Sequence, residues 1–359
     1  AGAAGAIPLD PNNFASLGAL PGSSFNLNTD AAGGGVIISQ GGSLPDISVF
    51  TYDGGGVFGA GETITVTGSN ALAILFKGTA TISGTIGVSG ATPVGSSSGP
   101  FGVAGGGKGG DSSVFNGIID FGQGPGAGQE GSTSAVISGA GSGSGAGFGT
   151  AGGQGGAGAT GRPGGGTYGD LQIALEAGSG GGGGGGYNAG SSNGGGAGGG
   201  AIEIGALTDL NLFGATILSN GGNGGNDSFG SGFGGGGGSG GSLLIHGYNV
   251  NIDVASLLQA NGGDGGRSGP AQGGCGGAGR IAILHNTSGS LNNNGTVEAL
   301  TGAGKDVCDT TNIVTILALA DIGEPTAPPP ETGISEPGPF AILSLGLLGV
   351  GFARRRRII

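Results

Sequence analysis

A recurrence of about 41 residues constrains this chain more than any other feature of its sequence. The stretch GGGAIEIGALTDLNLFGATILSNGGNGG begins at Gly198, and GGSLLIHGYNVNIDVASLLQANGGDGG begins at Gly240. Asn220 and Asn261 each precede a glycine pair at equivalent places. A third, more divergent copy reads GGAGRIAILHNTSGSLNNNGTVEALTGAG, and an earlier relative, ETITVTGSNALAILFKGTATISGTIGVSG, begins at Glu62. A fixed period of this length indicates a stacked repeat architecture.

Within each copy the apolar residues alternate in short runs, which is the period of a β-strand. Ile202 and Ile204 match Leu243 and Ile245, while Leu210 and Leu212 match Val250 and Ile252 after a one-residue slip. In the third copy the apolar places hold Ile281, Ile283, Leu291 and Val297. We expect an all-β chain, a parallel β-helix or solenoid in which Asn220 stacks on Asn261 and shares amide hydrogen bonds with it.

Glycine supplies 100 of the 359 residues, and much of it lies between the strand patterns as long inserts. Runs such as Gly180 to Gly186 are either mobile or hydrogen-bonded into extended polyglycine layers. A mobile loop of twenty residues adds only about 2.7 kcal/mol of length-dependent closure cost. Ordering every residue of such a loop would cost roughly tenfold more. This comparison favours mobile inserts.

The chain is acidic, with 10 Lys and Arg against 22 Asp and Glu. Four of the ten basic residues are Arg354, Arg355, Arg356 and Arg357, so few remain for the rest of the chain. Nucleic-acid binding depends on many Lys and Arg contacts to phosphate, so no nucleic-acid partner is expected. The same scarcity of bases argues against a polysaccharide lyase or hydrolase, although Asp209 and Asp253 lie on expected strands.

Few side chains suggest a metal or cofactor, and none is expected. Asp227 and Asp264 lie near the places of calcium-binding turn carboxylates, so weak calcium binding stays open beside their reading as solvated turn residues. His246 and His285 occupy corresponding strands and are expected to be exposed, with a metal-binding pair as the alternative.

Two cysteines, Cys275 and Cys308, flank the last repeat. In an oxidising compartment a disulfide between them would close a loop of about 33 residues and fasten the final coil. Two free thiols are the alternative.

The end of the chain, ISEPGPFAILSLGLLGVGFARRRRII, has the order of a membrane-inserted segment. Residues 338–353 are apolar and would span about 24 Å as a helix, against a hydrocarbon core of roughly 30 Å. Arginine stems can recover part of that difference by snorkelling. The arginines would stay in the cytoplasm and leave residues 1–333 outside. A proline-rich stretch, residues 323–335, precedes the segment as a linker.

A short Glu-Pro motif, an apolar helix and a terminal arginine cluster together resemble the PEP-CTERM sorting signal of envelope proteins in Gram-negative bacteria that make exopolysaccharide. The motif of that family is Pro-Glu-Pro, whereas this chain has Ser335 before Glu336 and Pro337. The resemblance implies that Glu336 and Pro337 are recognised by an exosortase, a membrane processing enzyme, and that Arg354 to Arg357 stop transfer. It also implies transient residence in the inner membrane, followed by release to the cell surface or extracellular matrix.

These observations divide the chain into an N-terminal strand region (1–61), glycine-rich solenoid repeats (62–322), a linker (323–335) and a sorting signal with a transmembrane helix (336–359). The expected function is that of an exported, non-enzymatic structural protein of the cell surface or matrix, with exopolysaccharide as a partner. The first residues, AGAAGA, suit a mature end after signal-peptide cleavage. The alternative is an adhesin or a glycan- or ice-binding solenoid; Thr63, Thr65 and Thr67 alternate as such a face requires, but the later repeats show no matching threonines.

Overall fold

The structure is a computed structural model. It describes residues 8–30, 35–94, 98–112, 121–132, 141–156, 161–186, 193–226, 233–267, 271–305, 308–320 and 322. Residues 1–324 form one compact unit. Residues 325–359 form a second unit that lies outside the described residues.

The described residues contain sixteen strands and one short 3-10 helix, η1 (Pro11–Asn13). The strands are β1 (Phe25–Asn28), β2 (Val36–Ile38), β3 (Ile47–Tyr52), β4 (Gly56–Phe58), β5 (Thr63–Thr67), β6 (Ala71–Phe76), β7 (Ala80–Ile82), β8 (Thr85–Gly87), β9 (Ala201–Leu212), β10 (Thr216–Leu218), β11 (Ser242–Ile252), β12 (Leu257–Gln259), β13 (Arg280–Asn286), β14 (Leu291–Asn293), β15 (Thr296–Glu298) and β16 (Val314–Leu319).

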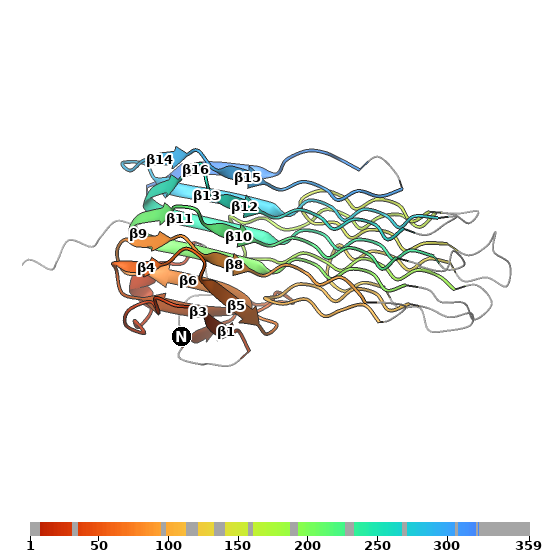
Figure 1. The fold of residues 1–359 in the computed structure, drawn as a ribbon, viewed down its shortest axis with the longest axis horizontal. Helices are drawn as coiled ribbons and strands as arrows, with labels where there is room; N and C mark the ends of the chain where they lie inside the picture. The colour runs from red at the N-terminus through yellow and green to blue at the C-terminus, as the bar shows by residue number, and fades with distance from the viewer. Residues whose placement is uncertain are drawn as a thin grey trace, which may run out of the picture. The chain divides into compact units, whose positions relative to one another are not determined.

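These strands form two sheets, which confirms an all-β chain with parallel sheets. The six-stranded sheet has the order β1-β5-β8-β10-β12-β15, and all its pairs are parallel. The ten-stranded sheet follows the order β16-β13-β11-β9-β6-β3-β2, with β4, β7 and β14 attached. Its antiparallel pair is β2 with β3, at one end. Successive coils of the chain cross the ten-stranded sheet, then the six-stranded sheet, and stack as Figure 1 shows.

The repeat alignment read from the sequence is the register of the structure. Ile202 pairs with Leu243, and Leu212 pairs with Ile252. The one-residue slip between these pairs is a register irregularity between Gly247 and Asn249 of β11, where β9 has one extra residue, as in a β-bulge. In a bulge two residues of one strand lie opposite one residue of its partner, and the two strands pair again on either side of it. In the copies that begin at Gly198 and Gly240 the first two apolar runs belong to one long strand, β9 or β11, where the sequence suggests two short ones. In the third copy they remain two strands, β13 and β14.

Aliphatic columns run through the stack between the two sheets. One column contains Phe50, Ile74, Ile204, Ile245 and Ile283, each in register with the next and at most 2% exposed. The facing column from the six-stranded sheet contains Ile64, Ile86, Ile217 and Leu258. Each coil thus buries its side chains mainly against the coils above and below, which is why the repeats must stack to be stable.

The glycine-rich segments lie side by side as extended chains that run away from the strands (Figure 1). Successive N–H groups bond to different neighbouring chains: Gly180 donates to Gln123 O at 2.8 Å, Gly181 to Gly196 O at 2.9 Å and Gly182 to Ser144 O at 2.9 Å. Every third residue returns to the same neighbour, since Gly178, Gly181 and Gly184 donate to Gly199, Gly196 and Asn193. A three-residue period without bonds inside the chain is that of the polyproline II helix. We call these segments, the described residues within 98–200, 219–241 and 260–279, the glycine array.

The expectation of mobile inserts is therefore wrong for the described part of these segments, including Gly180 to Gly186. That expectation compared the closure cost of a mobile loop with the entropy cost of ordering it. It left out the hydrogen bonds and the close packing that many such chains supply to one another. Glycine is required because the chains approach one another too closely for a side chain. A Cβ on Gly182 would overlap the Gln129 carbonyl, well inside the 3.0 Å that real Cβ atoms keep.

The N-terminal residues belong to the same stack as the repeats. β3 pairs along its length with β6, and β1 pairs with β5, so the fold has no boundary at residue 61. Residues 1–324 accordingly form a single unit.

Candidate functional site

The two sheets differ in what covers their outer faces. Over the ten-stranded sheet lies a second apolar cluster, to which the N-terminal segment contributes Leu9 and the turn near residue 171 contributes Leu171 and Leu175. The six-stranded sheet has no such cover among the described residues, and its burial pattern alternates between buried and more exposed positions. We call this outer surface the bare face. Its side chains are Asn26, Asn28, Thr63, Thr65, Thr67, Thr85, Thr216, Leu218, Leu257, Gln259, Thr296 and Glu298.

A row of threonines crosses the bare face. Thr63 is in register with Thr85, and Thr85 with Thr216. Leu257 takes the next place and Thr296 the one after it. The expectation that later repeats do not continue the threonines is wrong for the Thr63 row, which Thr216 and Thr296 extend. It is confirmed for the Thr65 row, whose later places hold Gly87, Leu218, Gln259 and Glu298. The hydroxyls of Thr63, Thr85 and Thr216 therefore repeat at the spacing of neighbouring strands, about 4.8 Å, and Leu257 interrupts the row before Thr296.

The row pattern continues from the strands onto the glycine array. Asn220 receives a hydrogen bond from the N–H of Asn261 at 2.8 Å, and Asn223 from the N–H of Asp264 at 2.7 Å. Asn220 does stack on Asn261, but its side-chain oxygen accepts from the backbone, where an amide-to-amide bond was expected. Asn223 follows Asn220 by three residues, with a glycine pair between them. The polar side chains therefore form parallel rows separated by glycine pairs. These bonds hold the side chains in a fixed arrangement.

The bare face is nearly uncharged. Among the strands of the six-stranded sheet, Glu298 is the single charged residue, and the single aromatic residue is Phe25, which packs against the core. Such a surface offers hydroxyl and amide groups in rows, with neither the basic patch that an anionic polymer needs nor an aromatic ring on which a sugar could stack.

Further ladders of side chains join the coils elsewhere. Asn251 Nδ2 donates to Asn211 Oδ1 at 2.8 Å, and Asn292 Nδ2 donates to Asn251 Oδ1 at 2.7 Å. Asp209 accepts a bond of 2.7 Å from Asn249 Nδ2. Asp253 accepts from the Gly214 N–H at 2.9 Å and from the Ser256 hydroxyl at 2.7 Å. The Gly214 N–H, aided by that hydroxyl, holds the pKa of Asp253 below its usual value.

The two histidines lie in different surroundings. His246 is buried, against expectation, and its Nε2 lies 2.9 Å from Glu203 Oε1, which also accepts the Leu9 N–H at 2.6 Å. Gly205 leaves the room that the His246 ring fills. His285 is in register with Gly247 rather than with His246, so the structure does not stack the two rings as a metal-binding pair. Glu203 was missed from the sequence because it stands in an alternating strand pattern that gives no sign of the covering N-terminal segment.

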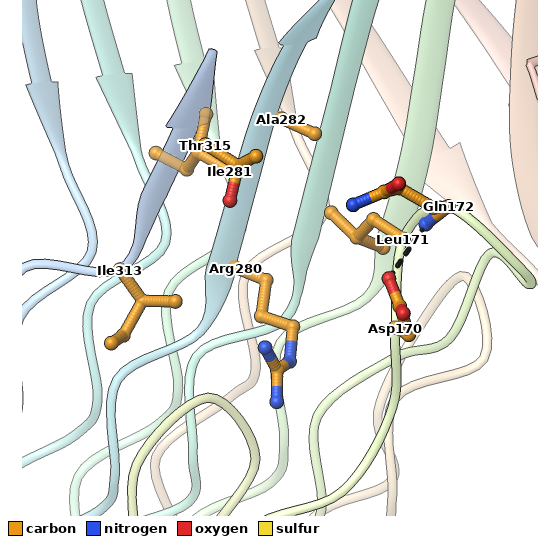
Figure 2. A pocket seen from close by; sticks show the side chains of 8 residues that line it. All are labelled: Asp170, Leu171, Gln172, Arg280, Ile281, Ala282, Ile313 and Thr315. Atoms are coloured by element: carbon orange, nitrogen blue, oxygen red, sulfur yellow. Dashed lines mark hydrogen bonds between the residues drawn. The ribbon is translucent and has the colours of Figure 1, made fainter. Parts of the chain in front are cut away.

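A small pocket opens beside the ten-stranded sheet (Figure 2), lined by Asp170, Leu171, Gln172, Arg280, Ile281, Ala282, Ile313 and Thr315. The guanidinium of Arg280 donates to Tyr168 O through Nε at 3.2 Å and through Nη2 at 2.9 Å. It also lies 5.5 Å from the centre of the Phe148 ring. Arg280 thereby joins the segment at Tyr168 to the start of β13. Burial raises the pKa of the Tyr168 phenol and that of the Glu176 carboxyl.

The structure joins Cys275 and Cys308 in a disulfide, with their Cα atoms 6.6 Å apart. The bridge ties the last coil to the glycine array, where a Cβ on Gly153 would meet both sulfur atoms.

Metal-binding geometry is not found in the part of the chain that the structure describes: no group of three or more His, Cys, Asp or Glu side chains gathers there. Asp264 Oδ1 accepts the Ala303 N–H at 2.7 Å, as a ladder residue. Asp227 lies outside the described residues.

The sorting-signal residues Glu336, Pro337 and Arg354 to Arg357, with the expected C-terminal helix, also lie outside the described residues. Among the residues that are described, no helix has the length and apolar character needed to cross a bilayer. Comparisons with protein-family models, curated proteins and solved structures find no match to this chain.

Proposed function

We propose that the protein is an exported β-solenoid that serves as a non-enzymatic structural element of the cell surface or extracellular matrix. The observation that carries the proposal is the glycine array. Its segments are joined to one another and to the strand stack by backbone hydrogen bonds, so the body is a stiff, laterally bonded block. A stiff block with almost no positive charge suits a spacer or scaffold among acidic or neutral polymers.

The C-terminal residues supply the proposed route to the surface. The apolar run at residues 338–353 would hold the protein in the inner membrane for a time, with Arg354 to Arg357 on the cytoplasmic side. An exosortase would then cut near Glu336 and Pro337 and release the body to the surface, where exopolysaccharide is the proposed partner. The Cys275–Cys308 bridge is consistent with an oxidising compartment outside the cytoplasm.

Mass spectrometry of the C-terminal peptide, from protein recovered at the cell surface, tests this route. A new end near Glu336 without the arginine cluster is expected. An intact end at Ile359 would mean permanent anchoring, and recovery of the body from the cytoplasm alone would refute export.

A second candidate function is binding through the bare face, as a surface adhesin or as a glycan- or ice-binding solenoid. The three threonines in register across β5, β8 and β10, with Thr296 of β15 beyond Leu257, favour it, because regular rows of neutral hydroxyls suit a regular, hydroxyl-rich surface. Replacing Thr216 by Lys should abolish inhibition of ice recrystallisation or retention on an insoluble neutral glycan. Val57→Lys, at an exposed position of the other sheet, is the matched control. Equal behaviour of the two variants would remove this candidate.

No catalytic role is proposed for Asp209 or Asp253. Both carboxylates accept hydrogen bonds from side chains or backbone that fix the coils, and both are accounted for by that role. A polysaccharide-active enzyme remains the least favoured proposal, and cleavage of the host's own exopolysaccharide by the purified protein would revive it.

A further inference from the structure

Among the described residues the stack of coils ends in two strand edges that have no partner. β16 is the last strand of the ten-stranded sheet and pairs with β13 alone among these residues. β15 is the last strand of the six-stranded sheet and, within the same described part, pairs with β12 alone. An edge strand presents a row of N–H and C=O groups that can pair with another chain.

The aliphatic columns also end at this coil. Ile316 is the next member of the column that contains Ile245 and Ile283, because it is in register with Ile283. Ile283 is fully buried, whereas Ile316 is 49% exposed. In the facing column Leu258 is fully buried, and its neighbour Val297 is only partly covered. One more layer of aliphatic side chains would complete both columns.

β16 lacks the features that usually protect an edge. Its sequence, VTILAL, contains no charged residue and no proline, the residues by which natural edge strands avoid pairing. The opposite end of the stack is built differently: its edge strand β2 pairs antiparallel with β3 and exposes Val36 and Ile37, while Leu20 and Leu27 of the core are each at most 7% exposed. A parallel edge strand at one end and an antiparallel edge strand at the other make the two ends unlike.

We propose that a second copy of this chain stacks on the last coil, with the two C-terminal coils face to face around a twofold axis. The occupant must supply an unpaired strand edge together with a layer of aliphatic side chains. The last coil carries both, and a twofold contact uses the same patch on each partner. The interface pairs the exposed edges of the last coils and buries Ile316 of both copies.

Such a contact closes on itself, so it yields a dimer and leaves both N-terminal ends free. The first coils then point outward in opposite directions, and the bare face is doubled in length. A surface scaffold built in this way spans twice the distance of one chain.

Sedimentation equilibrium of the full chain over a wide concentration range tests the proposal. A mild non-ionic detergent keeps the apolar run at residues 338–353 in solution and is present for every variant. The wild-type protein should dimerise. Ile316→Lys places a charge in the centre of the contact twice per dimer and should raise the dissociation constant at least about 30-fold, as for a hot-spot residue. Val254→Lys, 81% exposed in the turn after β11, is the matched control and should dimerise as the wild type does.

Ala318→Lys provides a second variant in case Ile316→Lys perturbs folding, since Ala318 is exposed on the same strand. Amide exchange in β16 should slow as the protein concentration rises. A wild-type monomer at every concentration, or dimers unchanged by both lysine variants, would overturn the proposal. Open-ended filaments would also overturn it, because they require contact between unlike ends.

Discussion

The glycine array makes a quantitative prediction about a single methyl group. Gly182 lies inside the array, donates to Ser144 O at 2.9 Å and accepts from the Gly236 N–H at 2.8 Å. A Cβ there would overlap the Gln129 carbonyl, and the atoms it meets are backbone that is itself bonded to further chains. Gly182→Ala must therefore push two chains apart.

The cost follows from two contributions. Overpacking of a well-packed interior costs about 1–3 kcal/mol. Two weakened backbone hydrogen bonds add about 0.5–1.5 kcal/mol each. Gly182→Ala should thus destabilise the protein by about 2–6 kcal/mol. Gly166 is the matched control, because it lies in another glycine segment, has no atom within 4 Å of a built Cβ and does not adopt a positive φ. Gly166→Ala should be neutral or stabilise by about 0.4–1 kcal/mol, since it reduces the freedom of the unfolded chain.

Urea denaturation followed by circular dichroism measures both variants, and hydrogen exchange locates the change. We expect the Gly182 variant to lose amide protection in residues 178–185 and in the chains bonded to them. If both variants shift the unfolding midpoint equally, or if wild-type residues 178–185 exchange within seconds, the close-packed array is refuted.

Three further predictions concern the bonds between coils. Asn251→Ala should destabilise the stack by about 1–3 kcal/mol because it removes two ladder hydrogen bonds. Asn292→Ala, at the exposed end of the same ladder, should cost less than half as much, and urea titrations compare the two variants. Reducing the disulfide between Cys275 and Cys308 opens a loop of 33 residues and should lower the free energy of unfolding by about 4 kcal/mol. An unfolding midpoint that reductant does not change would contradict this. The depressed pKa of Asp253 contributes stability above the unfolded pKa of 3.8, and that contribution is lost as the pH falls through the lower folded pKa. Asp253→Asn should therefore weaken the dependence of the unfolding midpoint on pH below about pH 4. An unchanged pH dependence in that range would count against the Gly214 contact.

Much of the strand stack could be predicted from the sequence. The alternation of apolar residues gave the strand period, and the 41-residue recurrence gave the partners, so Ile202 against Leu243 and Leu212 against Ile252 were read correctly, including the slip. Side chains that repeat at equivalent places must stack when coils stack, which makes register a local property of the repeat.

Features that join distant or unlike segments could not be read in this way. The burial of His246 against Glu203 depends on an N-terminal segment that covers the sheet, and the threonine row begins with Thr63 and Thr85, which lie at different places of one repeat copy.

The sequence by itself determined that the chain is all-β, acidic and repetitive, because strand period, charge and recurrence are properties of residues in order. Only the tertiary structure decided that the glycine segments form a packed array. A single glycine chain cannot order itself, since it has no side chain to bury and the conformational entropy that it loses is large. Many chains together satisfy one another's backbone groups at separations that glycine alone permits, and that effect exists only in three dimensions.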